Sequence, residues 1–151
     1  MTSSKSGWEG TINPQPKVGT FASRSRTTSM NDIEMFTQMT GDKNPLHYDQ
    51  ELASASPFGA IIVQGGVTTG LLNAVVAEDL PGPGSVFLET NWKFLKAVKV
   101  GENITATIRV VEVRKDKPIC KLETTVSNSD GDECVTGTAT TYTMPLTKPS
   151  L

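Results

Sequence analysis

Cysteine is scarce in this sequence of 151 residues, which contains only Cys120 and Cys134. Two cysteines could form one disulfide if the fold brought them together. In a simple hairpin centred on Asn128–Gly131, however, Cys120 would face the neighbourhood of Ala139. We therefore expect two free thiols, which indicates a reducing compartment such as the cytoplasm.

An excess of positive charge is also lacking. The chain has 14 Lys and Arg against 16 Asp and Glu, a formal net charge of -2 and a pI near 5.4. Proteins that bind nucleic acid need a basic footprint for the phosphates, so no nucleic-acid partner is expected. The length and the 36% hydrophobic content suit one globular domain with one core.

No stretch is suited to crossing a membrane. Residues 58–77 carry no charge, but their glycines, with Gln64 and Asn73, are poor material for a span. The first 19 residues hold few large apolar side chains and no apolar targeting segment. The sequence thus predicts a flexible arm at 1–19, a single domain at 20–147, a tail at 148–151, and no targeting signal.

Two helices of different character are predicted. Ser29 is a typical N-cap with Asp32 three residues on, and Gly41 is a suitable C-terminal stop. Between them, apolar residues recur at helical spacing, namely Met30, Ile33, Phe36 and Met39. The second helix, at about 65–78, is apolar around most of its circumference and is expected to be buried on nearly all sides.

Strands are predicted at 20–28 and throughout the chain after Gly84. Apolar residues alternate with polar ones along 86–94, 104–110 and 120–126, and a last strand covers 133–144. The alternation changes phase at Val111, which indicates a bulge. Because short turns join consecutive strands, we expect an antiparallel meander of about five strands wrapped around the second helix, an α+β fold.

The only histidine, His47, follows Asp42 by five residues. On a helix this spacing would turn the side chains about 140° apart, and on a strand it would place them on opposite faces. Pro45, between them, favours a loop instead, because it has no N–H and restricts Asn44 to extended conformations. A loop allows the carboxylate and the imidazole to converge on one point.

This loop resembles the signature of the MaoC-like, R-specific enoyl-CoA hydratases (hydratase 2 family). The residues that carry the resemblance are Gly41-Asp42-Lys43-Asn44-Pro45-Leu46-His47-Tyr48-Asp49, with Phe36 as the aromatic residue in the preceding helix. The stretch Ala60-Ile61-Ile62-Val63-Gln64-Gly65-Gly66 matches a second family segment, and Gln64 replaces the histidine usual there. The resemblance covers roughly residues 20–144 and implies the hot dog fold.

The resemblance also implies a chemistry, the reversible hydration of trans-2-enoyl-CoA to (3R)-3-hydroxyacyl-CoA by a hydro-lyase. Asp42 and His47 would hold one water, with Asn44 orienting them. The backbone N–H of Gly65 would bind the thioester oxygen, beside Gln64 and Gly66. The substrate is itself an acyl-CoA or acyl carrier protein thioester, so no cofactor and no metal are expected.

Other interpretations of these residues remain open. Each of them alone is also common in ordinary turns, and Gly65 and Gly66 could serve close packing only. The same apparatus could dehydrate 3-hydroxyacyl groups on acyl carrier protein, or the module could bind acyl thioesters without turnover. An open edge strand and similar hot dog proteins indicate a homodimer.

Overall fold

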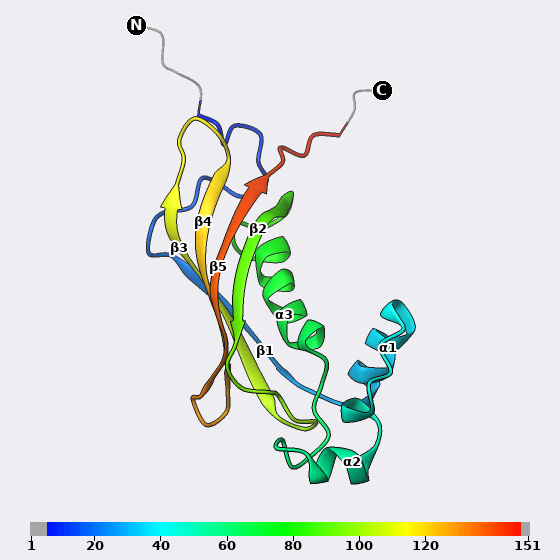
Figure 1. The fold of residues 1–151 in the computed structure, drawn as a ribbon. Helices are drawn as coiled ribbons and strands as arrows, with labels where there is room; N and C mark the ends of the chain where they lie inside the picture. The colour runs from blue at the N-terminus through cyan, green and yellow to red at the C-terminus, as the bar shows by residue number, and fades with distance from the viewer. Residues whose placement is uncertain (1–5, 149–151) are drawn as a thin grey trace, which may run out of the picture.

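The computed structural model describes residues 6–148 and folds them into one five-stranded sheet with a long helix lying along one face (Figure 1). The strands are β1 (Phe21–Thr27), β2 (Ser85–Phe94), β3 (Asn103–Val113), β4 (Ile119–Asn128) and β5 (Glu133–Thr143). The helices are α1 (Met30–Thr40), α2 (Gln50–Ala55) and α3 (Gly65–Glu78), with a 3-10 turn, η1 (Pro45–His47). The sheet curves around α3, which confirms the predicted hot dog arrangement.

The order of the strands differs from the predicted meander. It is β1-β3-β4-β5-β2, and all neighbouring pairs are antiparallel. The strand that follows α3, β2, therefore pairs with β5 at one edge, and β3 pairs with β1 near the other. Because α3 crosses the face of the sheet, the chain leaves the helix at the far edge and forms β2 there. Residues 95–102 then carry the chain back across to β3.

The predicted irregularity in β3 is confirmed. The register between β3 and β4 shifts between Val110 and Glu112, so Val111 is the bulged residue. Before the bulge, alternate residues of β3 face α3 and are at most 1% exposed, namely Ile104, Ala106, Ile108 and Val110. After the bulge, the alternation of inward-facing and outward-facing residues is shifted by one position, as the change in hydrophobic alternation indicated.

Helix α3 has the predicted limits, but it is not buried on nearly all sides. Leu72 and Val75 are fully buried against the sheet. Its opposite side, with Gly70 exposed and Ala74 partly so, lines an apolar groove of about 440 Å³ beneath α1. The sheet of one chain covers only one side of the helix, and composition alone does not reveal which side stays open.

The N-terminal segment contributes to the core, contrary to the prediction of a loose arm that adds little to it. Trp8 is 5% exposed, and its indole N–H donates to the carbonyl oxygen of Arg114 at 2.7 Å. The backbone N–H of Gly7 donates to the carbonyl oxygen of Lys115 at 2.7 Å. One tryptophan among polar residues has no periodicity, so no pattern in the sequence indicated this docking. Residues 1–5 and 149–151 lie outside the described part of the chain.

Both cysteines are free and buried, which confirms that part of the prediction. Cys120 lies opposite Thr141, two residues from Ala139, because the β4–β5 connection is irregular and shifts the register. Within residues 6–148, no helix combines the length and the apolar character needed to cross a membrane.

Candidate active site

Helix α1 delivers the chain into the loop that holds the candidate catalytic residues. Its start has the predicted capping box, in which the Ser29 side chain accepts from the Asp32 N–H and the Asp32 carboxylate accepts from the Ser29 N–H. Its end is Gly41, at φ 85°, whose N–H donates to the Thr37 carbonyl oxygen at 2.7 Å. This left-handed conformation suits glycine and turns the chain sharply toward Asp42.

The loop holds Asp42 through three of its four polar groups. Its N–H donates to the Thr40 hydroxyl at 3.2 Å, and its carbonyl oxygen accepts from the Thr37 hydroxyl at 2.7 Å. Its Oδ1 accepts from the backbone N–H of Asn44 at 3.1 Å. The remaining atom, Oδ2, faces the Nε2 of His47 at 3.8 Å. The backbone and one carboxylate oxygen are therefore fixed, and the other oxygen is available.

The turn that carries His47 is built by Asn44. Its side-chain Oδ1 caps η1 by accepting from the Leu46 N–H at 3.1 Å, and its carbonyl oxygen accepts from the His47 N–H at 2.9 Å. With its own N–H on Asp42, Asn44 orients both members of the pair. It does so through the loop backbone and the cap. Within residues 6–148, no hydrogen bond joins Asn44 to the imidazole of His47.

The imidazole of His47 has one defined orientation. Its Nδ1 lies 2.7 Å from the carbonyl oxygen of Ile62, and only an N–H can donate to that oxygen. In the neutral ring, Nε2 therefore carries the lone pair and points toward Asp42. The ring is 7% exposed, whereas the Asp42 side chain is 38% exposed. The pair thus presents one buried and one solvent-reachable group to the same space.

The N-terminus of α3 lies next to this loop. Gln64 is the N-cap residue, but its side chain does not cap the helix. Its Nε2 donates instead to the Ile33 carbonyl oxygen and to the Thr37 hydroxyl, each at 3.2 Å. Among the described residues, no hydrogen-bond acceptor is recorded for the backbone N–H of Gly65 or of Gly66. The free N–H groups and the positive end of the helix dipole make this a site that favours negative charge.

The three residues predicted to bind substrate differ in their surroundings. Gln64 is 2% exposed and is bonded to α1, so its amide is turned away from solvent. A Cβ at Gly66 would lie 2.3 Å from two atoms of the Phe36 ring, so this glycine permits close packing of α1 on α3. Gly65 is exposed, and a Cβ there would come within 3.0 Å of the Phe94 ring.

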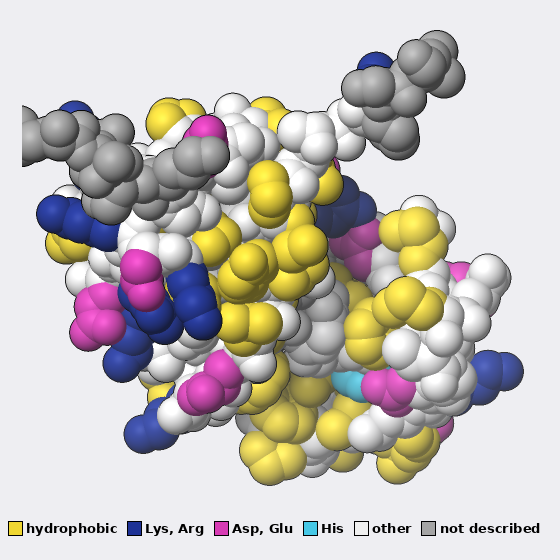
Figure 2. Space-filling view, turned by 90° about the horizontal axis from the view of Figure 1, so that it is seen from above, with side chains coloured by type: hydrophobic (Ala, Val, Ile, Leu, Met, Phe, Trp, Pro, Cys, Tyr) yellow, Lys and Arg dark blue, Asp and Glu magenta, His cyan; other side chains and the backbone are white. Residues whose placement is uncertain are grey.

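A second apolar cavity, of about 290 Å³, reaches Gly65 from the β2 side of the helix. Phe58, Ile62, Thr68 and Phe94 are among its lining residues. Figure 2 shows a hollow between the body of the molecule and the lobe that carries α1. Because Ile62, whose carbonyl oxygen accepts from His47, lines the cavity, the Asp42–His47 pair lies next to apolar surface.

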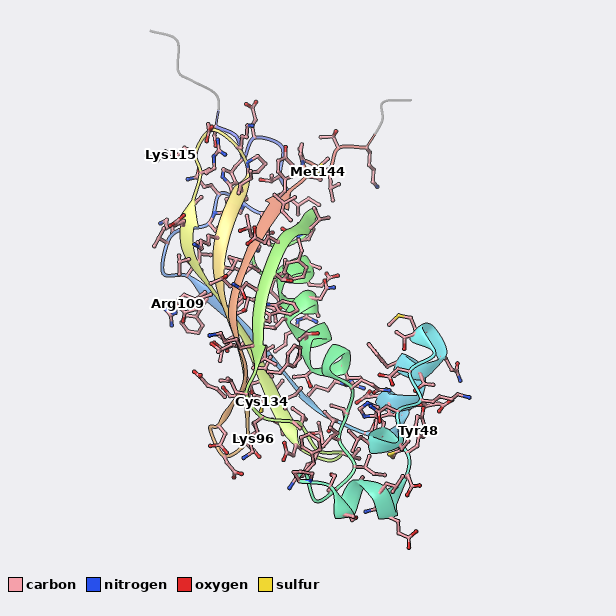
Figure 3. The ribbon with its side chains drawn as sticks, viewed as in Figure 1. Tyr48, Lys96, Arg109, Lys115, Cys134 and Met144 are labelled. Carbon is pink, nitrogen blue, oxygen red and sulfur yellow. The ribbon has the colours of Figure 1, made fainter. Side chains whose placement is uncertain are left out.

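Sequence analysis assigned no role to two residues that connect to the site. Thr37 is 4% exposed and bonds to Asp42, to Gln64 and to the hydroxyl of Tyr48. Tyr48 lies beside α1 in Figure 3, and its hydroxyl is 2.5 Å from the Thr37 hydroxyl and 3.0 Å from a Glu34 oxygen. A polar residue in a short helix gives no pattern that would distinguish Thr37 from a surface position.

No metal site is evident in the described range 6–148, where three or more His, Cys, Asp or Glu side chains nowhere gather in a way that could hold an ion. The chemical means of the site are thus one carboxylate, one imidazole and free backbone N–H groups. Such a set can activate water and stabilise an oxyanion.

The chain is similar to several known proteins. The (R)-specific enoyl-CoA hydratase of Aeromonas caviae is 34% identical over 123 residues, 82% of this chain and 92% of that protein. A solved structure of an (R)-hydratase from A. caviae involved in PHA biosynthesis matches with a TM-score of 0.82 and 32% identity, over 85% of this chain and 98% of that one. A mitochondrial 3-hydroxyacyl-[acyl-carrier-protein] dehydratase of Solanum lycopersicum is 31% identical over 126 residues, 82% of this chain and 75% of that protein. The family model described as MaoC like domain matches residues 13–131, and the chain therefore belongs to the MaoC-like domain family.

Proposed function

We propose that the protein catalyses the reversible hydration of trans-2-enoyl-CoA to (3R)-3-hydroxyacyl-CoA. The observation that carries the proposal is the facing pair of Asp42 Oδ2 and His47 Nε2, 3.8 Å apart, beside the uncapped start of α3. The (R) configuration of the product is inferred from the named activity of the A. caviae relative.

The separation of the pair suits one shared water. At 3.8 Å the two atoms are too far apart for a direct hydrogen bond, but one water can reach both at ordinary hydrogen-bond lengths. Asp42 Oδ2 and His47 Nε2 both present lone pairs, so the water would donate a proton to each. Its oxygen is then free to attack the C3 carbon of the enoyl group.

The proton transfers balance through the pair. As the C3–O bond forms, the water gives one proton to the Asp42–His47 pair, and the electrons of the C2–C3 double bond move toward the thioester oxygen. When the carbonyl re-forms, the pair returns one proton to C2, so its protonation state is restored. Asp42 is assigned as the activating base and His47 as the group that handles the C2 proton, so the proton that Asp42 takes from water passes to the lone pair of His47 Nε2 before it reaches C2.

The enolate-like charge on the thioester oxygen needs a donor. We assign this role to the N–H of Gly65, because it lies at the N-terminus of a 14-residue helix and has no side chain to obstruct a ligand. The exposed position of Gly65 at the end of the second cavity supports access by the thioester.

A second candidate is the dehydration of 3-hydroxyacyl groups carried on acyl carrier protein. The similarity to the mitochondrial dehydratase of S. lycopersicum favours it. Both carriers present an acyl-phosphopantetheine thioester, so one site could serve either. The net direction of the reversible reaction depends on the concentrations of substrate and product.

A steady-state assay of crotonyl-CoA hydration, monitored by the loss of the enoyl absorbance, tests the proposal. We expect turnover, with the (3R) product identified by chiral analysis. A higher kcat/KM with crotonyl-acyl carrier protein than with crotonyl-CoA would favour the second candidate. Binding of crotonyl-CoA without turnover of either substrate would contradict both and indicate a module that only binds acyl thioesters.

We also propose a cytoplasmic homodimer. Of the two edges of the sheet, β2 carries exposed apolar side chains, with Val86 51% and Leu88 57% exposed. The β1 edge is mostly polar, and its Arg24 and Arg26 pair with Asp79 and Asp32. An apolar open edge favours pairing with the same edge of a second copy, which would place both sites near the interface.

A further inference from the structure

The hydroxyl of Thr37 is a junction between three parts of the candidate active site. Its Oγ1 lies 2.7 Å from the carbonyl oxygen of Asp42, 3.2 Å from the Nε2 of Gln64 and 2.5 Å from the hydroxyl of Tyr48. These partners belong to the catalytic loop, to the residue before α3 and to the residue after η1. Thr37 itself is on the buried face of α1 and is 4% exposed.

The direction of each bond follows from the chemistry of the partners. A carbonyl oxygen can only accept, so the single proton of the Thr37 hydroxyl goes to Asp42. An amide NH₂ can only donate, and Gln64 gives one of its protons to Thr37 and the other to the Ile33 carbonyl oxygen. The Tyr48 hydroxyl then donates its single proton to the remaining lone pair at the shorter distance of 2.5 Å, so that proton is not available to the Glu34 oxygen 3.0 Å away. The hydrogen-bonding capacity of Thr37 is therefore full.

This junction connects the two ends of the chemistry. Asp42 carries the carboxylate that faces His47, and Gln64 immediately precedes Gly65, whose N–H is free. One hydroxyl therefore sets the position of the carboxylate backbone relative to the start of α3. Since misplacement by about 1 Å can cost about 10²-fold in rate, such a link matters for turnover.

We propose that Thr37 is a positioning residue for the reaction, which holds Asp42 in register with the oxyanion site through Gln64; this rests on the proposed function. The amide nitrogen of Gln64 offers two protons at one atom and so joins Thr37 to Ile33. Thr37 and Gln64 thus act as a matched pair.

Three substitutions at Thr37 separate the hydroxyl from the rest of the side chain. Thr37→Val keeps the shape but places a methyl against the Asp42 carbonyl, Thr37→Ala removes the hydroxyl without that clash, and Thr37→Ser keeps the hydroxyl. We expect kcat for crotonyl-CoA to fall about 10- to 100-fold in the Val and Ala variants, with KM changed less than threefold. Thr37→Ser should stay within about threefold of the parent, because it keeps the hydroxyl group. Since Ser and Ala differ only by that oxygen atom, their comparison isolates its effect.

Thr28→Val is the matched control for loss of a buried threonine hydroxyl. Thr28 is 2% exposed, donates to the Lys99 carbonyl oxygen at 2.8 Å and accepts from the Gly101 N–H at 3.1 Å. It should lower thermal stability as much as Thr37→Val does and leave kcat unchanged. Equal kcat values for Thr28→Val and the Thr37 variants would overturn the proposal. If Thr37→Val does not fold, the comparison of Ser with Ala still decides.

A coupling experiment tests whether Thr37 acts through Asp42. In an Asp42→Asn background, Thr37→Ala should reduce the residual kcat less than twofold, because the carboxylate it positions is absent. The same 10- to 100-fold loss in both backgrounds would show that Thr37 acts independently of Asp42 and would overturn the proposal. An inactive parent would instead refute the proposed function, so the two failures are distinguishable.

Discussion

The Nδ1 atom of His47 donates to the carbonyl oxygen of Ile62 at 2.7 Å, and the N–H of Ile62 donates in return to the carbonyl oxygen of Leu46 at 3.3 Å. This two-way contact joins the catalytic loop to the segment that leads into α3. It fixes the tautomer of the neutral ring and directs Nε2 to Asp42. A histidine free to rotate would share a water with Asp42 only part of the time.

The first prediction concerns the Asp42–His47 pair. Asp42→Asn and His47→Gln keep similar shapes and should each lower kcat/KM for crotonyl-CoA by about 10²- to 10⁴-fold. The double variant should be only slightly worse than the poorer single one, because both groups act on one water. Steady-state kinetics on folded variants provide the measurement.

Asp49→Asn serves as the control for the first prediction. Asp49 caps α2 by accepting from the Leu52 N–H at 3.0 Å, and asparagine can keep that bond. Activity should therefore stay at the parental value. If Asp42→Asn and His47→Gln also stayed within a few-fold of the parent, the catalytic assignment of the loop would be wrong.

The second prediction separates Gly65 from Gly66. Gly65→Ala brings a Cβ to 3.0 Å from Phe94, which is 62% exposed and can move, so thermal stability should change little. The added methyl stands beside the free N–H, so kcat/KM should fall by about tenfold or more. Gly66→Ala should instead lower the free energy of unfolding by about 1–3 kcal/mol, because its Cβ would overlap Phe36.

Thermal unfolding and crotonyl-CoA kinetics on the same preparations distinguish these outcomes. Adding Phe36→Leu to Gly66→Ala should restore part of the lost stability, since the smaller side chain makes room. A fully active, stable Gly65→Ala protein would remove the oxyanion assignment from Gly65.

The third prediction tests assembly at the β2 edge. We expect the parent protein to sediment as a dimer at micromolar concentration and Leu88→Lys to sediment as a monomer. Phe21→Lys is the matched change on the other edge, where Phe21 is 60% exposed beside the Arg109 guanidinium, and it should leave the dimer intact. A monomeric parent, or loss of the dimer only in Phe21→Lys, would contradict the assignment of the edge.

The fourth prediction concerns the stability of α1 in acid. Burial alone would raise the pKa of Asp32, but the bonds and charge of Arg26, with the N–H and hydroxyl of Ser29, together lower it from the usual 3.8. A lowered pKa in the folded state stabilises the protein above the unfolded value and loses that effect as the pH falls through the folded value. Stability should therefore drop below about pH 4.

Asp32→Asn keeps the cap but removes the charge, so at pH 7 it should lower the free energy of unfolding by about 1–2 kcal/mol. The difference from the parent should shrink as the pH falls below 4, measured by urea denaturation at several pH values. Asp79→Asn removes the partner of Arg24 and should have a much smaller effect, because the Asp79 side chain is 30% exposed and that of Asp32 only 5%. A constant difference between parent and Asp32→Asn from pH 7 to pH 2 would contradict the prediction.

The fifth prediction concerns the thiols. Burial raises the pKa of Cys120 to about 12, and burial followed by the charge of Glu102 raises the pKa of Cys134. At pH 8 the thiolate fraction of Cys120 is then roughly 1 in 10⁴. A thiol reagent such as DTNB should label neither residue in the native protein and both after unfolding. Rapid labelling of a native thiol would contradict the prediction and mean that the core around that cysteine opens.

Several features could be predicted from the sequence because short-range forces determine them. The capping box of Ser29 and Asp32 and the stop at Gly41 depend on hydrogen bonds and backbone sterics within a few residues. The hydrophobic phase likewise indicated the bulge at Val111. The five-residue spacing with Pro45 left only a loop to join Asp42 and His47, and the loop is what the structure contains.

Other features were decided only by tertiary structure, because they depend on contacts between distant parts of the chain. The place of β2 beside β5, the packing of Trp8 and the open side of α3 result from which surfaces meet, and no local pattern records that. The same holds for the site. Ile62 orients His47 from 15 residues away, and Gln64 reaches back 27 residues to Thr37. The sequence therefore determined which groups could react, and the packing of α1 against the start of α3 determined how they face one another.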